Sequence, residues 1–141
     1  MPSTRNILET LIGFDTTSRN SNMALMEYIS GVLHDCGQQT ELVPNDDQSK
    51  ANLYCTIGPQ DKAGVMLSGH TDVVPVDGQD WTFPPFTLTE ADGRYYGRGT
   101  TDMKGYVASA LAAACTASTR SLKTPLHLAF SYDEEIGCVG V

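Results

Sequence analysis

The chain has 141 residues, of which 40% are hydrophobic, and its formal net charge at pH 7 is −8. This length and composition allow one ordinary hydrophobic core, so we expect a single globular unit. The acidic balance, without any run of Lys or Arg, argues against a nucleic-acid partner. No window approaches the roughly 20 apolar residues that a membrane span needs, and residues 1–14 are too polar for a signal peptide. We therefore expect no membrane partner and a cytoplasmic location.

Two amphipathic helices are predicted at the start of the chain. Ser3 is a suitable N-cap for the first helix. Its apolar face consists of Ile7, Leu8, Leu11 and Ile12. Residues 25–36 repeat apolar side chains at helical spacing, and Gly37 is a typical helix stop. A polar segment, residues 16–21, separates the two helices.

Three predicted strands follow the helices, with polar turns between them. They cover residues 40–43, 52–57 and 64–69. Their apolar runs suit a sheet that is covered on both faces. Residues 86–99 then alternate in character around an Asp92-Gly93 turn, which predicts a β-hairpin.

The last third of the chain predicts one helix and one further strand. Residues 106–118 are rich in Ala and Leu and have high helix propensity, and residues 125–132 form another apolar strand segment. This order of elements predicts an α/β fold with a mostly parallel, mixed sheet flanked by helices. Residues 136–141 carry no stop signal, so we expect the chain to continue into a larger domain.

The four cysteines give no pattern typical of a disulfide framework. Cys36, Cys55, Cys115 and Cys138 are irregularly spaced, and each lies in or beside an apolar segment. We therefore predict buried, reduced thiols, although the even number leaves a pairing open.

Ionisable residues follow the predicted strands at places where such sheets bind ligands. The sequence HTD, residues 70–72, follows one strand, DEE, residues 133–135, follows another, and Asp102 precedes a helix. Ligands of open α/β sheets bind outside the carboxyl ends of the strands, so these groups are expected to converge. Several carboxylates in one cleft are costly unless cations compensate their charge or some of them are protonated. The pattern therefore predicts a pair of divalent metal ions.

Each of these residue types suits a different task at such a centre. His70 offers a neutral imidazole, and Asp72 can reach its other ring nitrogen and fix the tautomer. Asp102 lies between a glycine-rich turn and a helix, where a short carboxylate can contact two metal ions. Glu134 and Glu135 are adjacent, and adjacent side chains at a strand end point to opposite sides. One of them can bind metal while the other takes a proton from water, as metal-assisted hydrolysis requires.

Simpler explanations exist for each signal alone. A His after a strand is often a loop residue, and acidic pairs are often solvated surface, but three such signals together favour a metal site. His34 is expected in solvent near a helix C-terminus, and His127 as a hydrogen-bonded structural residue. Two further groups could contact substrate or merely pack at the surface: the aromatic Trp81, Phe83 and Phe86, and the basic Arg94, Arg98 and Lys104.

Three segments resemble a known enzyme family. Residues 68–76, 81–105 and 131–140 are similar to the dinuclear-zinc deacylases and carboxypeptidases, a family with a zinc-exopeptidase-like catalytic domain. It contains acetylornithine deacetylases, succinyl-diaminopimelate desuccinylases, aminoacylases and glutamate carboxypeptidases. Residues 86–106 look most like the acetylornithine deacetylases. This resemblance implies a hydrolase of linear amides acting on a small N-acyl amino acid, here N2-acetyl-L-ornithine in arginine biosynthesis.

The resemblance also implies a role for each candidate residue. His70 would bind one metal ion, Asp102 would bridge both, and Glu135 would bind the other. Asp72 would orient His70, and Glu134 would be the general base. The cofactors would be two divalent ions, with zinc favoured and cobalt an alternative, and the peptide bond from Asp102 to Met103 would be cis.

Members of this family are more than twice as long as this chain. The resemblance implies that residues 1–141 are the N-terminal part of the catalytic domain, inactive alone. The lid and dimerisation domain, the rest of the catalytic domain and two further metal ligands would lie outside it, and the full-length protein would be a homodimer. The alternatives are a desuccinylase or another acyl-amino-acid hydrolase of the same family and, from a different class, a non-catalytic metal-binding or interaction module.

Overall fold

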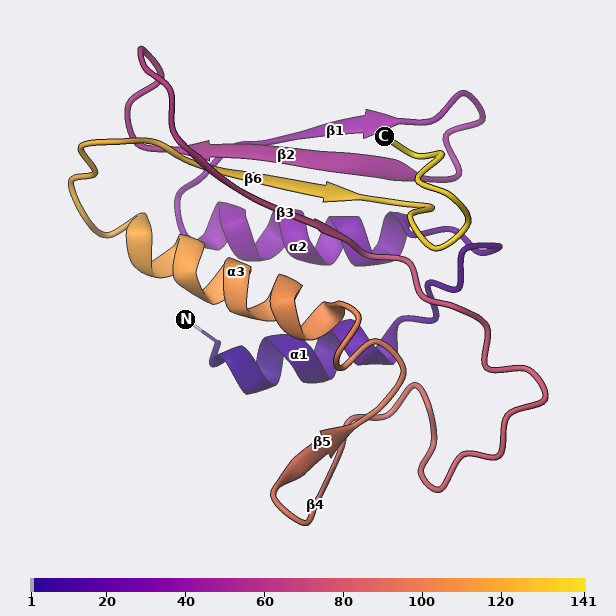
Figure 1. The fold of residues 1–141 in the computed structure, drawn as a ribbon. Helices are drawn as coiled ribbons and strands as arrows, with labels where there is room; N and C mark the ends of the chain where they lie inside the picture. The colour runs from indigo at the N-terminus through magenta and orange to yellow at the C-terminus, as the bar shows by residue number, and fades with distance from the viewer. Residues whose placement is uncertain (1) are drawn as a thin grey trace.

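The computed structural model describes residues 2–141 as a four-stranded sheet with three helices on one face (Figure 1). Helices α2 and α3 contact the sheet, and α1 packs along α3. The hydrophobic core lies between the helices and the strands. Among the described residues, no helix is long and apolar enough to span a membrane.

The three helices confirm the sequence predictions. Helix α1 covers Thr4–Gly13, and the Ser3 side chain accepts a hydrogen bond from the Asn6 N–H at its start. The four residues of its predicted apolar face are all buried. Helix α2 covers Met23–Asp35. Helix α3 covers Lys104–Ala117 and so begins two residues before the predicted start at residue 106.

The main sheet has the strand order β1-β2-β6-β3. Its strands cover Thr40–Pro44 (β1), Ala51–Ile57 (β2), Val65–His70 (β3) and Leu126–Ser131 (β6). The mixed sheet is confirmed, but only β3 and β6 are parallel, and the other two pairings are antiparallel. Among the described strands, the expectation of a mostly parallel sheet is therefore wrong. The turn between β1 and β2 is too short for a crossover, so it can only join antiparallel neighbours.

The helices cover only one face of this sheet. Along β2, buried residues alternate with half-buried ones, as expected of a strand with one covered face. At the start of β3, Val65 is 59% and Met66 52% exposed. The expectation of a sheet covered on both faces is therefore wrong for residues 2–141, because α1, α2 and α3 all lie on the same side (Figure 1).

The predicted hairpin forms a separate two-stranded sheet. Strand β4 covers Thr89–Ala91 and strand β5 covers Arg94–Tyr96, and they pair antiparallel. Asp92 and Gly93 have φ values of 51° and 70°. Both central residues of a tight hairpin turn need positive φ, which an Asp-Gly pair supplies at little cost.

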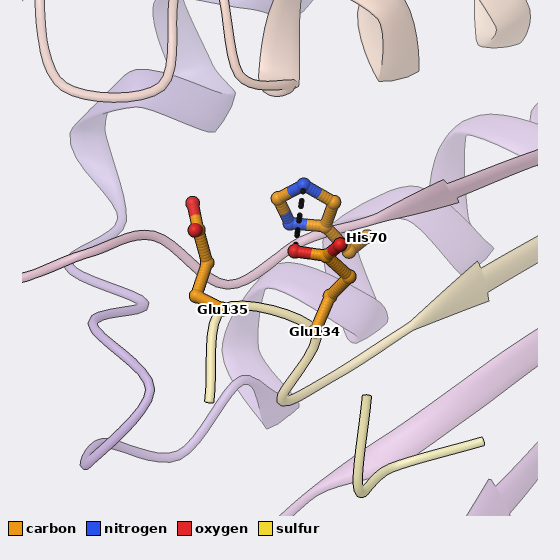
Figure 2. A group of neighbouring side chains, drawn as sticks. All are labelled: His70, Glu134 and Glu135. Atoms are coloured by element: carbon orange, nitrogen blue, oxygen red, sulfur yellow. Dashed lines mark ion pairs between the residues drawn. The ribbon is translucent and has the colours of Figure 1, made fainter. Parts of the chain in front are cut away.

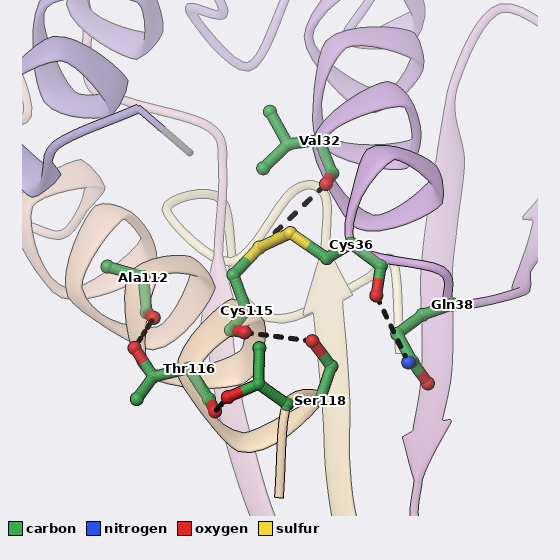
Figure 3. Close-up of a disulfide and its surroundings, with 8 residues drawn as sticks. Val32, Cys36, Gln38, Ala112, Cys115, Thr116 and Ser118 are labelled. Atoms are coloured by element: carbon green, nitrogen blue, oxygen red, sulfur yellow. Dashed lines mark hydrogen bonds between the residues drawn. A yellow bond between two sulfur atoms is a disulfide. The ribbon is translucent and has the colours of Figure 1, made fainter.

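The prediction of four reduced thiols is wrong for one pair. Cys36 and Cys115 form a disulfide with their Cα atoms 5.4 Å apart (Figure 3). They are 79 residues apart in the sequence, and they meet because α2 and α3 pack together near their C-terminal ends. Cys55 is buried and free, as predicted, whereas Cys138 is free but exposed.

Candidate metal centre

Parallel pairing of β3 with β6 brings the HTD and DEE segments together. In the register of the two strands, His70 at the end of β3 pairs with Ser131 at the end of β6. Beyond this pair, the N–H and the hydroxyl of Thr71 both donate to the Ser131 carbonyl oxygen at 2.9 Å. The two chains therefore leave the sheet side by side at its carboxyl edge, where ligands bind in such folds.

The two glutamates project from a turn that follows β6. Asp133, just before them, has a φ of 56°, so the chain has already left the extended conformation. Glu134 and Glu135 consequently lie on the same side, facing His70, instead of on opposite sides as strand geometry predicts (Figure 2). One ligand atom from each of these three residues lies within 4.8 Å of the others.

Asp102 completes this group from the start of α3. Its Oδ1 lies 3.0 Å from His70 Nε2, and Glu134 Oε2 lies 3.7 Å from the same nitrogen. The Asp102 side chain is 72% exposed, so it stays open to a ligand. The peptide bond from Asp102 to Met103 is cis, as the family resemblance implies. Gly105 is needed here because a Cβ at this position would collide with the Thr100 carbonyl oxygen.

Asp72 lies buried behind the group and contacts most of its members. The His70 Nδ1 lies 3.0 Å from the Asp72 main-chain oxygen and 3.4 Å from its Oδ1. The Asp72 carboxylate accepts the N–H of Glu134 at 3.1 Å and that of Glu135 at 3.2 Å. The Ser18 hydroxyl donates to Asp72 Oδ2 at 2.6 Å. One buried carboxylate therefore holds the imidazole and the glutamate turn in fixed relative positions.

Several carboxylates crowd around one imidazole in this group, and their contacts shift the pKa values of His70, Asp72 and Glu135. Hydrogen bonds to Asp72 and then Asp102 raise the pKa of His70 to about 9, although burial opposes the shift. Burial alone would raise the pKa of Asp72, but hydrogen bonds from His70, Ser18 and the glutamate N–H groups outweigh it and lower this pKa to about 2. Desolvation, followed by repulsion from Asp102, raises the pKa of Glu135.

The donor set fits divalent metal ions. It combines an imidazole nitrogen with carboxylate oxygens, the ligands that zinc takes at catalytic sites. Within residues 2–141, none of these carboxylates forms an ion pair with Lys or Arg. In residues 2–141, the protonated ring of His70 is the cation that offsets their repulsion, and divalent ions bound at the group would offset it more fully.

Comparison with known proteins agrees with this geometry. Residues 66–141, more than half of the chain, match the model of peptidase family M20/M25/M40. The chain belongs to this family. It is 39% identical over 132 residues to a protein named acetylornithine deacetylase from Pasteurella multocida, covering 93% of this chain and 34% of that protein. A protein of the same name from Klebsiella pneumoniae is 41% identical over 121 residues, 85% of this chain and 31% of its own length.

Solved structures of the M20 family have the same fold. A metallo-carboxypeptidase from Sulfolobus solfataricus superimposes with a TM-score of 0.86 over 99% of this chain and 33% of its own, at 24% sequence identity. The M20 chain described here thus spans about a third of the length of the relatives that it matches.

Lys104 differs from the sequence prediction of an exposed basic residue. It is fully buried in the first turn of α3, and its Nζ donates a hydrogen bond to the Phe14 carbonyl oxygen at 2.7 Å. Burial lowers the pKa of Lys104 to about 7, against an opposing effect of Asp15. The side chain is covered because α1 packs along this face of α3 in the M20 chain.

The two remaining histidines lie outside the centre. His127 Nδ1 lies 2.8 Å from the Tyr54 hydroxyl and 2.9 Å from Thr56 Oγ1, which agrees with the predicted structural role. His34 is exposed in the last turn of α2, also as predicted.

The aromatic loop before the hairpin packs largely on itself. Arg98 lies over the Trp81 ring, 4.9 Å from its centroid, and donates to Gln79 at 2.8 Å. The rings of Phe83 and Tyr96 have their centroids 5.1 Å apart. The sequence allows two interpretations of these aromatic residues, a substrate wall or packing at the surface. The contacts favour packing at the surface.

Ser18 is a site residue that no pattern in the sequence singles out. It belongs to the polar segment between α1 and α2, yet it is buried and hydrogen-bonded to Asp72. Val73 and Thr17 form a parallel bridge that brings this segment to the end of β3. A polar run between two amphipathic helices is the one signal in the sequence, and it reveals neither the burial of Ser18 nor its partner.

Proposed function

We propose that the chain forms the N-terminal part of the catalytic domain of a metal-dependent amide hydrolase. The reaction that we infer is the deacetylation of N2-acetyl-L-ornithine by water, which yields acetate and L-ornithine. The names of the relatives at 39% and 41% identity support this substrate. In this proposal the full-length protein is a homodimer that serves arginine biosynthesis, and it is cytoplasmic although disulfides such as Cys36–Cys115 are rare in that compartment.

The observation that carries the proposal is the convergence of four ionisable side chains on one edge of the sheet. His70, at the end of β3, has Asp102 Oδ1 at 3.0 Å, and the ligand atoms of Glu134 and Glu135 lie within 4.8 Å. They come from three separate segments of the sequence, and no Lys or Arg of the described part of the chain is paired with the carboxylates. The protonated ring of His70 offsets only part of the repulsion among these carboxylates, which two divalent ions would offset more fully.

In this proposal His70 would hold one ion, Glu135 would hold the other, and Asp102 would hold both. Zinc is favoured over cobalt because imidazole nitrogen and carboxylate oxygen suit it well. Asp72 holds the His70 ring from the Nδ1 side, so that Nε2 faces Asp102 and Glu134, where an ion would bind. When bound, divalent ions supply a Lewis acid that polarises the amide carbonyl and makes a water acidic near neutral pH.

Glu134 acts as the general base. Its side chain is 46% exposed, so its carboxylate can reach the attacking water, and its N–H is anchored on Asp72 Oδ1. It takes one proton as the water oxygen forms a bond to the acyl carbon. It then returns this proton to the amine nitrogen as the C–N bond breaks, so that Glu134 ends as it began.

Substrate hydrolysis by the full-length protein tests the proposal. The zinc-loaded protein should release acetate from N2-acetyl-L-ornithine with a kcat/KM at least about tenfold above that for N-succinyl-diaminopimelate, a preference of about 1.4 kcal/mol. The reverse preference would assign it to the desuccinylases. Zinc binding without hydrolysis of any N-acyl amino acid would favour the alternative of a non-catalytic metal-binding module.

A further inference from the structure

A nearly buried ion pair lies behind the proposed metal centre. Lys50 Nζ is 2.6 Å from Asp133 Oδ1 and 2.7 Å from Oδ2, and the two side chains are only 14% and 11% exposed. The same Nζ donates to the Ser18 carbonyl oxygen at 2.5 Å and lies 5.8 Å from the centre of the Tyr132 ring. None of these residues is a proposed metal ligand or the proposed base.

We infer that Lys50 is a positioning residue that fixes the Glu134-Glu135 turn and Asp72 for metal binding, through its bonds to Asp133 and Ser18. This inference rests on the proposed function of the centre. It gives Lys50, the residue just before β2, a part in the site. The other members of the site lie at the end of β3, in the turn after β6 and just before α3.

The first connection runs through Asp133 to the glutamates. Asp133 has a φ of 56°, a left-handed conformation that a residue with a side chain adopts at a cost. Both of its carboxylate oxygens are held by Lys50, which stabilises this conformation. The turn directs the next two N–H groups onto Asp72 and both glutamate side chains toward His70. Without Lys50, the turn is free to relax and to separate the two carboxylates.

The second connection runs through Ser18 to Asp72. Lys50 Nζ holds the main-chain oxygen of Ser18, and the Ser18 hydroxyl donates to Asp72 Oδ2 at 2.6 Å. Asp72 in turn faces the Nδ1 of His70. The Lys50 ammonium group therefore joins Ser18 and Asp133, which are 32 and 83 positions away from it in the sequence. Both connections lead to the buried carboxylate of Asp72.

The geometry of this cluster explains why the residue must be a cation with several donors. Lysine offers three N–H bonds, and here two acceptors, a carboxylate and a carbonyl, surround it. An apolar side chain of similar length would fill the space but would leave the buried Asp133 carboxylate without a partner. Lys62 is a suitable control, because it is exposed in the turn before β3 and forms no ion pair in residues 2–141.

The test uses the full-length protein with Lys50→Met, Lys50→Arg and the control Lys62→Met. Zinc affinity is measured by competition with a chromophoric chelator, and kcat and KM are measured with N2-acetyl-L-ornithine. We expect Lys50→Met to weaken zinc binding about 10- to 100-fold, the range for residues that support metal ligands. It should lower kcat more than it changes KM. Lys50→Arg should restore part of the affinity, and Lys62→Met should match the wild type.

A second variant separates positioning from folding. In Lys50→Met/Asp133→Asn no unpaired charge is buried, and Asn tolerates the left-handed conformation, so the melting temperature should return toward that of the wild type. Zinc binding should nevertheless stay weakened, because the bonds from Lys50 to Ser18 and to residue 133 remain absent. If either protein that carries Lys50→Met is folded and binds zinc within twofold of the wild-type affinity, the inference is overturned.

The outcomes also distinguish this inference from the proposed function. A wild-type protein that binds zinc but does not hydrolyse N-acyl amino acids would overturn the proposed function, while the zinc affinities would still decide the role of Lys50. A protein that binds no zinc would overturn both.

Discussion

The two ends of helix α3 are built from different chemistry. At its start, Asp102 approaches His70, and the first turn buries Lys104 against a main-chain carbonyl. At its other end, Cys115 is fully buried and bonded to Cys36, which directly follows α2 (Figure 3). The first end depends on hydrogen bonds between charged and polar groups, and the second on a covalent bond among apolar side chains. The comparison suggests that one end serves ligand chemistry and the other serves stability.

If this division is correct, changes at the two ends should have separable effects. Changes at the site end should alter turnover or metal affinity and leave the melting temperature nearly unchanged. Changes at the disulfide end should do the reverse. The predictions below test this separation, from the largest expected effect to the smallest.

Replacing the proposed base should have the largest effect. Glu134→Gln in the full-length protein keeps the shape of the side chain but cannot accept a proton from water. We expect kcat to fall by about 10²- to 10⁴-fold, the usual contribution of general acid–base catalysis, with the zinc content and the melting temperature unchanged. Glu27→Gln, an exposed position on α2, is the matched control. A Glu134→Gln enzyme with wild-type kcat would remove this residue from the mechanism.

Opening the disulfide should affect stability and spare the chemistry. Cys36→Ser removes the link between α2 and α3, and we expect the free energy of unfolding to fall by about 2–4 kcal/mol, as measured by urea unfolding without reductant. The kcat should stay within about twofold of the wild type, a change below about 0.5 kcal/mol. Adding reductant should lower the stability of the wild type but not that of Cys36→Ser. If the wild type has the same free energy of unfolding with and without reductant, the Cys36–Cys115 disulfide is absent.

The N-cap of α1 offers a smaller change on the helix that packs along α3. Ser3→Ala removes the acceptor for the Asn6 N–H and should cost about 1 kcal/mol of unfolding free energy. Ser3→Asp preserves an acceptor and should cost little. Thermal unfolding of the three proteins measures the difference, and kcat should not change. A drop in kcat with Ser3→Ala would show that α1 transmits strain to the site end of α3.

Thiol labelling gives the mildest test, because it leaves the fold intact. Cys138 is exposed in the turn after the glutamates, whereas Cys55 is buried and burial raises the pKa of its thiol. Without reductant, Cys138 should react quickly with a thiol reagent, and Cys36, Cys55 and Cys115 should not. Peptide mapping by mass spectrometry identifies the labelled sites. Rapid labelling of Cys115 in the native protein would argue against both the disulfide and the buried end of α3.

The features predicted well from the sequence are those that local rules control. The apolar spacing and Ser3 predict α1, and Asp92-Gly93 predicts the hairpin. The rule that ligand groups follow strand ends predicted that His70 would meet Glu134 and Glu135, because the rule depends only on the carboxyl edge of a sheet.

The features missed are contacts between distant segments. The Cys36–Cys115 bond and the Lys50–Asp133 ion pair join residues 79 and 83 positions apart. No local pattern encodes such a distance. Lys104 shows the same limit, since its burial depends on α1 packing over it and not on its place in the helix. The antiparallel pairing of β2 with β6 was missed for this reason too, whereas that of β1 with β2 follows from the short turn between them.

Zinc positions in a crystal of the full-length protein test the central claim most directly. Anomalous scattering at the zinc edge locates bound ions independently of any activity. We predict two peaks about 3.5–4 Å apart, with His70 Nε2 about 2.0–2.1 Å from one of them. Asp102 should contact both ions, and Glu135 should contact the ion that His70 does not bind. Zinc bound only at sites that involve neither His70 nor Asp102 would contradict the account.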